Sequence, residues 1–147
     1  MYKYIKKLHE ECKIDLLDIQ ALEKKFDIKF PLEMVDFYLQ YNDTEIYLSE
    51  IETDEDTFQV VSFYPIRYRY SPHAITVDMA MLWNKLDGFI NPKLIEFAGD
   101  PAGDPYFCDS ISGEIYLIPH EDIDEPIKIC DSFNEFLSRL HVCDSNI

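Results

Sequence analysis

Three aspartates, Asp100, Asp104 and Asp109, occur within the stretch FAGDPAGDPYFCDS, which runs from position 97 to position 110. Carboxylates that converge within a few ångströms can chelate a metal ion or act as an acid and base pair. This stretch contains no histidine, lysine or arginine that would complete such a site. Its glycines permit positive φ, and aspartate accepts hydrogen bonds from its own turn, so we expect a shaped loop without a catalytic residue.

Two other groups of residues have side chains that can ligate a metal ion. His120 is followed by four carboxylates before Pro126, but such a charged run is more typical of an exposed loop before an edge strand. The four cysteines, at positions 12, 108, 130 and 143, have neither CxxC spacing nor a histidine at a zinc-finger interval. We expect reduced thiols, with Cys108 and Cys130 in the core, and we predict neither a metal ion nor a cofactor.

Charge is the strongest compositional feature of the 147-residue chain, whose formal net charge is −16. Such a surface repels phosphate backbones and anionic lipids, which argues against nucleic-acid and membrane binding. It attracts basic partners, although acidity also simply confers solubility. No lysine or arginine occurs between Phe30 and Ile66, where nine acids are found: Glu33, Asp36, Asp43, Glu45, Glu50, Glu52, Asp54, Glu55 and Asp56.

Two short helices are expected at the start of the chain. Residues 2–12 carry apolar side chains at helical spacing, and residues 18–26 do so more regularly. Asp18 is placed to cap the second helix, because its carboxylate can accept from free backbone N–H groups of the first turn. Leu17 and Leu22 then fit the positions of a hydrophobic staple.

A third helix and a strand are expected before the middle of the chain. Pro31 fits the first position of the helix, where its missing N–H costs nothing, and Asn42 tolerates the left-handed geometry that ends it. The acidic residues 50–56 then indicate an exposed loop. Residues 58–63 are β-branched and aromatic, which favours a strand.

The second half of the chain combines one helix with a succession of strands. Thr76 is a suitable cap for a helix over residues 76–86, in which Trp83 is most simply a core residue. A short hairpin containing Gly113 joins the second and third of four predicted strands, which cover residues 93–98, 105–109, 114–118 and 126–130.

The last helix is the clearest element in the sequence. Ser132 and Glu135 form a capping box, and apolar residues follow at helical spacing up to Leu140. Helices first, then a run of strands, then a closing helix are typical of an α+β fold. We therefore predict one α+β domain over residues 1–147, with a mixed but mostly antiparallel sheet flanked by N-terminal helices, a middle helix and a C-terminal helix.

Three motifs, taken in order, resemble the SUKH superfamily. They are IQALEKKFDIKFPLEMVDFYLQYND at positions 19–43, IEFAGDPAGDPYFCDSISGEIYLI at positions 95–118, and the helix from Ser132 to Leu140. The resemblance covers residues 14–141. It departs from the family pattern at Phe30, where leucine is usual before the proline, and in the residues that follow the YN pair.

The SUKH superfamily includes cell-wall-assembly regulators and immunity proteins of bacterial toxin systems. The resemblance implies an α+β domain with one mixed sheet and no enzymatic activity. It implies a cytoplasmic immunity protein that binds and neutralises a cognate basic toxin, a nuclease or nucleic-acid deaminase, by protein–protein occlusion. The alternative is a regulatory or scaffold domain with a host protein partner, and the oligomeric state is left open.

The predicted partner-binding residues combine acids with aromatic anchors. Charge mainly sets the rate and specificity of an encounter, whereas buried aromatic side chains supply affinity. The run 50–56 is either the partner-facing edge or a solvated loop. The predicted residues are Asp43, Glu45, Tyr47, Glu50, Glu52, Asp54, Glu55, Asp56, Asp100, Asp104 and Tyr106.

Overall fold

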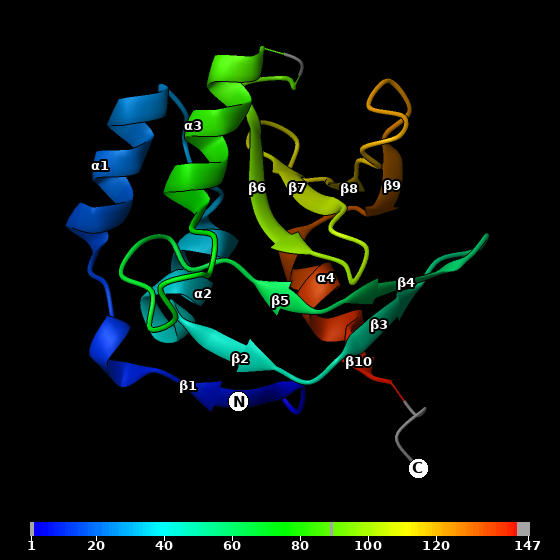
Figure 1. Ribbon diagram of the computed structural model, residues 1–147, viewed down its shortest axis with the longest axis horizontal. Helices are drawn as coiled ribbons and strands as arrows, with labels where there is room; N and C mark the ends of the chain where they lie inside the picture. Colours follow the sequence, from blue (N-terminus) through cyan, green and yellow to red (C-terminus); the bar gives the residue numbers. More distant parts are fainter. Residues whose placement is uncertain (1, 89, 144–147) are drawn as a thin grey trace.

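The computed structural model describes residues 2–88 and 90–143, and it confirms the α+β class (Figure 1). Helices and strands are interspersed along the chain, and the strands lie in antiparallel sheets. Within the described residues, the longest helices have 11 residues, or about 16 Å, too short to cross a bilayer. The helices are α1 (Leu16–Phe26), α2 (Leu32–Tyr41), α3 (Val77–Asp87) and α4 (Phe133–Arg139), with a 3₁₀ turn, η1 (Glu10–Cys12).

Strand pairing divides the molecule into three sheets, and every pair among the described residues is antiparallel. The orders are β1-β2, β10-β3-β4 and β5-β6-β7-β8-β9, in place of the single mixed sheet that the resemblance implied. The strands are β1 (Ile5–Leu8), β2 (Thr44–Ile46), β3 (Ser49–Glu52), β4 (Thr57–Val60), β5 (Ser62–Phe63), β6 (Leu94–Gly99), β7 (Pro105–Asp109), β8 (Ile115–Leu117), β9 (Ile127–Cys130) and β10 (His141–Val142).

An aromatic cluster joins the five-stranded sheet to the helices behind it. The Phe97 ring of β6 lies 5.2 Å from that of Phe133 and 5.3 Å from that of Phe136, centroid to centroid, in edge-on contacts. Phe37 of α2 contacts Phe63 and Phe133 in the same cluster. These rings are buried, and such pairs add to the stabilisation from area burial.

Elements with strong local signals form where the sequence predicted them. The hydroxyls of Thr76 and Ser132 accept hydrogen bonds from the backbone N–H groups of Met79 and Glu135, each at 3.1 Å, which confirms both helix caps. The four predicted strands between residues 93 and 130 are β6 to β9, with ends that move by no more than two residues. The hairpin between β7 and β8 contains Gly113, whose φ is 82°.

The N-terminal predictions need correction. Residues 2–12 do not form a helix, because β1 pairs with β2 through partners such as Ile5 and Ile46. Helix α1 begins earlier than expected, with Asp15 as its N-cap, and Asp18 completes the capping box from inside the helix. Leu17 is consequently 72% exposed and takes no part in a staple.

Three further expectations were wrong at the level of single residues. Glu50 and Glu52 belong to β3 instead of a loop, and the strand predicted over 58–63 is divided between β4 and β5. Asn42 has right-handed helical angles, φ −50° and ψ −48°. Its side chain instead makes three hydrogen bonds to backbone groups of distant residues, two of them buried and one partly buried.

Candidate partner-binding surface

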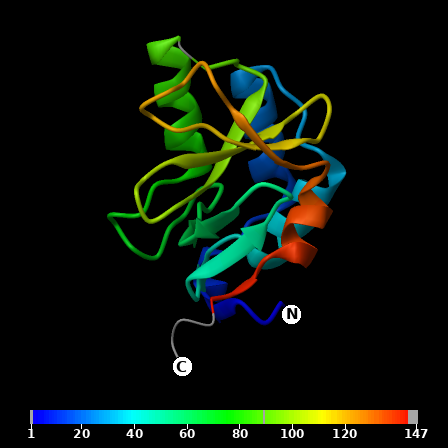
Figure 2. The ribbon, with the colours of Figure 1, turned by 90° about the vertical axis from the view of Figure 1, so that its right-hand side faces the viewer.

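The β3–β4 hairpin carries three consecutive acids at its tip, residues 53–56. The Thr53 hydroxyl donates to the carbonyl of Asp56 and accepts from the N–H groups of Glu55 and Asp56. This one side chain therefore organises the turn. In Figure 1 the hairpin extends away from the rest of the molecule, and in Figure 2 it points toward the viewer. The carboxylates of Asp54, Glu55 and Asp56 are carried on this projection.

A groove of about 800 Å³ lies between the hairpin tip, β9 and the start of α4. The wall of the groove that faces the hairpin tip is β9, the outermost strand of the five-stranded sheet. Such a groove is large enough to receive side chains from a protein partner. The apolar side chains that line it are Phe58, Pro126, Ile127 and Ile129.

The cations of this groove are already paired with other acids. Lys128 Nζ lies 2.7 Å from carboxylate oxygens of both Glu114 and Asp131, which hold the pKa of Lys128 above its usual range. Arg139 pairs with Glu135 at 2.9 Å and donates to the backbone carbonyl of Glu52. Within the described residues, no ion pair neutralises the carboxylates at the hairpin tip, so the rim of the groove is strongly negative.

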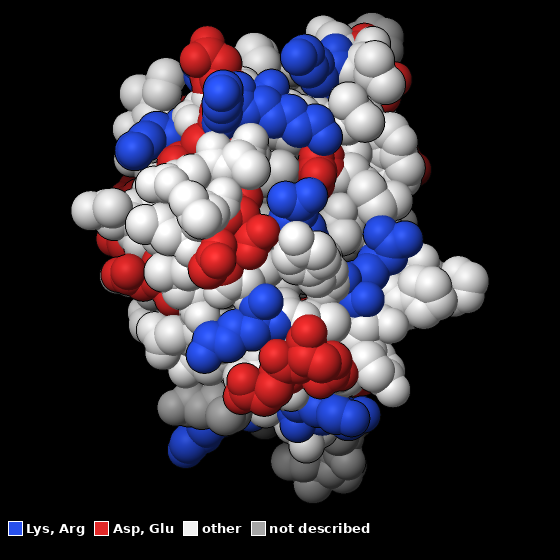
Figure 3. All heavy atoms as spheres, turned by 90° about the vertical axis from the view of Figure 1, so that its left-hand side faces the viewer, with Lys and Arg blue, Asp and Glu red and all other residues white. Residues whose placement is uncertain are grey.

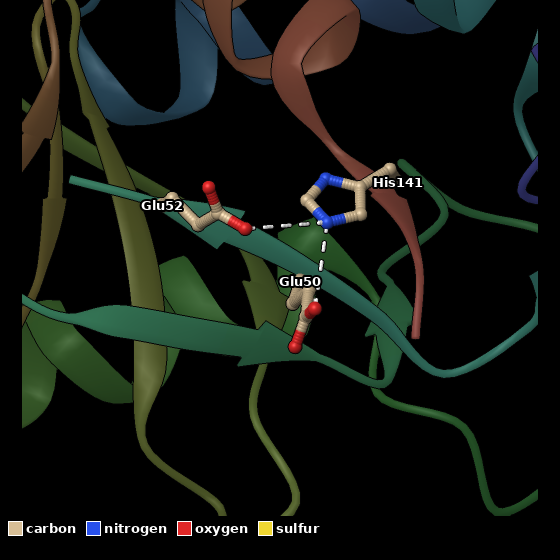
Figure 4. A group of neighbouring side chains, drawn as sticks. All are labelled: Glu50, Glu52 and His141. Atoms are coloured by element: carbon tan, nitrogen blue, oxygen red, sulfur yellow. Dashed lines mark ion pairs between the residues drawn. The ribbon is translucent and has the colours of Figure 1, made fainter. Parts of the chain in front are cut away.

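Glu50 and Glu52 gather with His141 on one face of the three-stranded sheet (Figure 4). His141 Nε2 lies 3.4 Å from Glu50 Oε1 and 3.7 Å from Glu52 Oε1. The ligand atoms of all three lie within 4.8 Å of one another, so the group could hold a divalent cation. Cross-strand ion pairing, with His141 opposite Glu50 in the β10–β3 register, accounts for the same arrangement without one.

Asp43, Glu45 and Tyr47 lie around β2, away from the hairpin tip. Asp43 is buried and accepts a hydrogen bond of 2.6 Å from the N–H of Tyr70, whereas Glu45 pairs with His9 at 2.6 Å. Tyr47 is exposed, and Lys6 Nζ lies 6.0 Å from its ring centroid. The face of the molecule opposite the hairpin carries lysines and arginines interspersed with acids, in contrast to the hairpin (Figure 3).

The three aspartates between positions 97 and 110 each serve a separate backbone segment. Asp100 Oδ1 accepts from the N–H of Asp104 at 2.7 Å, as expected of a turn-shaping aspartate. The Asp104 carboxylate accepts from the N–H of His120 at 3.1 Å and pairs with its ring. Asp109 accepts from two N–H groups of the β7–β8 hairpin. Their carboxylates therefore hold loops in place, each in its own position.

Tyr106 does not occupy the position expected of a partner contact. Its side chain is fully buried, its ring centroid lies 5.5 Å from that of Phe136, and its hydroxyl donates to the carbonyl of Gln59 at 2.6 Å. Burial raises the pKa of this hydroxyl above its usual range. Tyr106 joins β7 to β4 inside the molecule, where a partner has no access to its ring.

Sequence reasoning missed an exposed apolar face on α3. Trp83 was expected in the core but is 50% exposed, beside the exposed Leu82 and Leu86. The buried face of α3 is formed by Val77, Ala80 and Met81, whose side chains are smaller than that of Trp83. Asn84, whose Nδ2 donates to Glu96 at 3.1 Å, lies on the side of the helix that faces β6. The sequence carried no clear signal of this, because an asparagine is more often found on the exposed side of a helix.

A family model described as SMI1 / KNR4 family (SUKH-1) matches residues 13–139. No curated protein matches the chain. The matched range runs from just before α1 to the last residue of α4, and it includes the hairpin, β9 and the whole five-stranded sheet.

Proposed function

Because the chain belongs to the SMI1/KNR4 family (SUKH-1), we propose that it is a cytoplasmic immunity protein for a basic toxin. The SUKH family is known for toxin immunity and related functions. The proposed partner is a nuclease or nucleic-acid deaminase, and the proposed mechanism is occlusion of its nucleic-acid-binding surface. The protein binds and performs no bond chemistry of its own.

The observation that carries this proposal is the acidic hairpin beside the groove. Toxins that act on nucleic acids need basic surfaces to hold phosphates. Asp54, Glu55 and Asp56 offer such a surface three adjacent carboxylates that take part in no ion pair among the described residues. The groove behind them provides apolar area for the partner's side chains. Glu50 and Glu52 extend the acidic area along β3.

Co-expression with the toxin encoded next to this gene tests the proposal. The native protein should protect growth and should co-purify with the toxin. The combined substitution Asp54→Asn, Glu55→Gln, Asp56→Asn should lose protection at low expression levels. A control with the same change of net charge, Glu10→Gln, Asp87→Asn, Glu121→Gln, alters exposed acids outside the groove and should protect as the native protein does. Equal loss in both variants would contradict a specific role for the hairpin.

The exposed apolar face of α3 favours a second candidate, a regulatory or scaffold domain with a host protein partner. Trp83, Leu82 and Leu86 form an aromatic and aliphatic group of the kind found at binding hot spots. Trp83→Ala should then abolish capture of a host protein while leaving toxin protection intact. A gene without a neighbouring toxin, together with such a capture, would favour this candidate over the first.

A further inference from the structure

Three possible metal ligands converge on one face of the three-stranded sheet (Figure 4). Glu50 and Glu52 are two residues apart in β3, so both side chains project from the same face of the strand. His141 of β10 lies directly opposite Glu50, and its Nε2 atom faces the two carboxylates. Among residues 2–88 and 90–143, no other group of three histidine, cysteine or acidic side chains converges as closely. We call these three residues the β3–β10 triad.

Cross-strand ion pairing accounts for the position of the triad but not for its distances. Nε2 of His141 lies 3.4 Å from Glu50 Oε1 and 3.7 Å from Glu52 Oε1. A direct pair is shorter, as between His9 and Glu45 at 2.6 Å, and a single Nε2–H proton bonds well to only one acceptor. Ligand atoms at about 2.0–2.2 Å from a tetrahedral zinc ion lie about 3.3–3.6 Å from one another. The spacing in the triad is therefore close to that of ligands around a common ion.

The second ring nitrogen of His141 determines what Nε2 presents to the carboxylates. Nδ1 makes a hydrogen bond of 3.3 Å with the backbone carbonyl of Arg139. A carbonyl only accepts, which assigns the donor proton to Nδ1, and in the neutral imidazole Nε2 then carries a lone pair. This lone pair faces two carboxylates that also offer only lone pairs. A cation between the three groups removes the conflict, because each of them can donate an electron pair to it.

Glu50 is also oriented by a contact from outside the triad. The Cys143 thiol donates to Glu50 Oε2 at 3.6 Å, while Oε1 is the oxygen nearer to His141. Histidines that ligate metal ions typically donate their other ring N–H to a backbone carbonyl, a carboxylate or water, and ligating carboxylates are themselves hydrogen-bonded. The carbonyl of Arg139 and the thiol of Cys143 supply both kinds of contact.

The ligand set indicates which kind of ion fits the triad. Ca²⁺ and Mg²⁺ prefer oxygen ligands throughout and take at least about six of them. An imidazole ligand instead suits zinc and related transition metals. Two carboxylates balance the charge of a divalent ion, and three protein ligands leave the fourth position of a tetrahedral zinc site for water.

We propose that the β3–β10 triad binds one zinc ion, with Glu50 Oε1, Glu52 Oε1 and His141 Nε2 as its ligands. The ion joins β3, the first strand of the hairpin, to β10, and so stabilises the pairing of a strand of only two residues. Glu50 and Glu52 are then neutralised, whereas the acids at the hairpin tip, residues 54–56, keep their charge. The site does not depend on the proposed immunity function.

Isothermal titration calorimetry of the full chain, freed of metal ions and kept reduced, tests the site with zinc chloride as the probe. We expect saturation at one zinc ion per chain and no binding of Mg²⁺ at the same concentration. Excess zinc should also raise the melting temperature, because a ligand that binds the folded state stabilises it. Absence of saturation, or equal binding of Mg²⁺, would overturn the proposal.

Matched variants separate the triad from the other histidines and acids of the chain. His141→Gln should weaken zinc binding at least about tenfold, whereas His120→Gln, at an exposed histidine, should leave it unchanged. Glu50→Gln should likewise weaken binding about tenfold, and Glu121→Gln, at an exposed glutamate, should not. Both triad side chains are at least partly exposed, so the variants should fold.

NMR spectra of the imidazole nitrogens give a second readout. Zinc should shift the Nε2 resonance of His141 while Nδ1 keeps its proton. Zinc binding that survives undiminished in His141→Gln and Glu50→Gln, or that is lost equally in the two control variants, would refute the assignment. Neither experiment needs a partner protein, so failure here leaves the proposed immunity function standing.

Discussion

Two hollows are lined by carboxylates but hold them in opposite ways: the groove beside the hairpin tip, and a hollow of about 410 Å³ between β2 and β5, which we call the β2–β5 cavity. At the hairpin the acids project from a turn and form no ion pair among the described residues, because the cations of the groove are paired with other acids. In the cavity Asp43 is buried, and Glu45 is bonded to a buried histidine. Exposed charge accelerates encounter, whereas enclosed and desolvated contacts slow dissociation. The hairpin therefore has charges available for an encounter, whereas the carboxylates of the cavity are already used inside the fold.

The largest expected effect is on the stability of the cavity side. Asn42→Ala removes bonds of 2.6 Å to Cys12, 2.8 Å to Arg67 and 2.8 Å from the N–H of Ile66. Each is worth about 1 kcal/mol, and buried backbone groups are left unpaired, so the free energy of unfolding should fall by about 3 kcal/mol. Urea denaturation measures it. A loss below about 1 kcal/mol would show that the cavity wall does not depend on this side chain.

The next effect concerns how fast a toxin is captured. Asp54→Asn, Glu55→Gln, Asp56→Asn should slow association about tenfold at low salt and flatten its salt dependence, because these charges act before contact. Dissociation should change by no more than about twofold. Stopped-flow mixing or surface plasmon resonance with the purified toxin separates the two rates. Faster dissociation with unchanged association would contradict a role of the hairpin acids in the encounter.

Alkaline pH should weaken both regions through their buried thiols. Burial raises the pKa of Cys12, near the cavity, to about 11, and that of Cys130, in the groove, to about 12. In the unfolded chain a thiol titrates near pH 8.5, so it releases its proton first as pH rises. Stability should be flat below about pH 8 and should decline between about pH 9 and 11. Urea midpoints at pH 8 and pH 10 check this, and Cys12→Ala should reduce the difference. An unchanged midpoint would mean that the thiols ionise as readily in the fold as in the unfolded chain.

The smallest expected effect is on stability at the hairpin tip, where Thr53 can be compared directly with Asn42. Thr53, like Asn42, makes three side-chain bonds to backbone groups, but its bonds are exposed to water. Thr53→Ala should therefore cost less than about 1 kcal/mol. Amide exchange should accelerate at residues 54–56 alone. A loss as large as that of Asn42→Ala would remove the distinction between an exposed and an enclosed region.

Sequence reasoning succeeded where a signal is local. The caps at Thr76 and Ser132 act on N–H groups three residues away, and the β6–β9 strands are joined to their neighbours by short segments. It failed where pairing is distant. Within the 2–12 segment β1 forms because β2, from beyond two helices, lies beside it. Glu50 lies opposite both Gln59 of β4 and His141 of β10, and the second of these partners is distant in the sequence.

The candidate site was predicted in part. The acids of the hairpin were identified from their charge alone. The structure adds that they line a groove, together with β9. Tyr106 was predicted at the surface but is buried, and Trp83 was predicted in the core but is exposed. Spacing alone could not decide either case, because an aromatic residue fits the periodicity of a helix or strand on its buried or its exposed face. The β2–β5 cavity was not foreseen, since it depends on where two sheets part, and only long-range topology determines that.

Strand β3 sits between β4, its neighbour in the chain, and β10, which contains His141 and Val142. On the ribosome β3 and β4 are made well before β10, which follows only after α3, the five-stranded sheet and α4 have been synthesised. One edge of β3 must wait unpaired for several seconds at ordinary rates of translation. An unpaired edge invites strands from other chains. Newly made copies on one messenger are thus most vulnerable to aggregation before β10 has been synthesised.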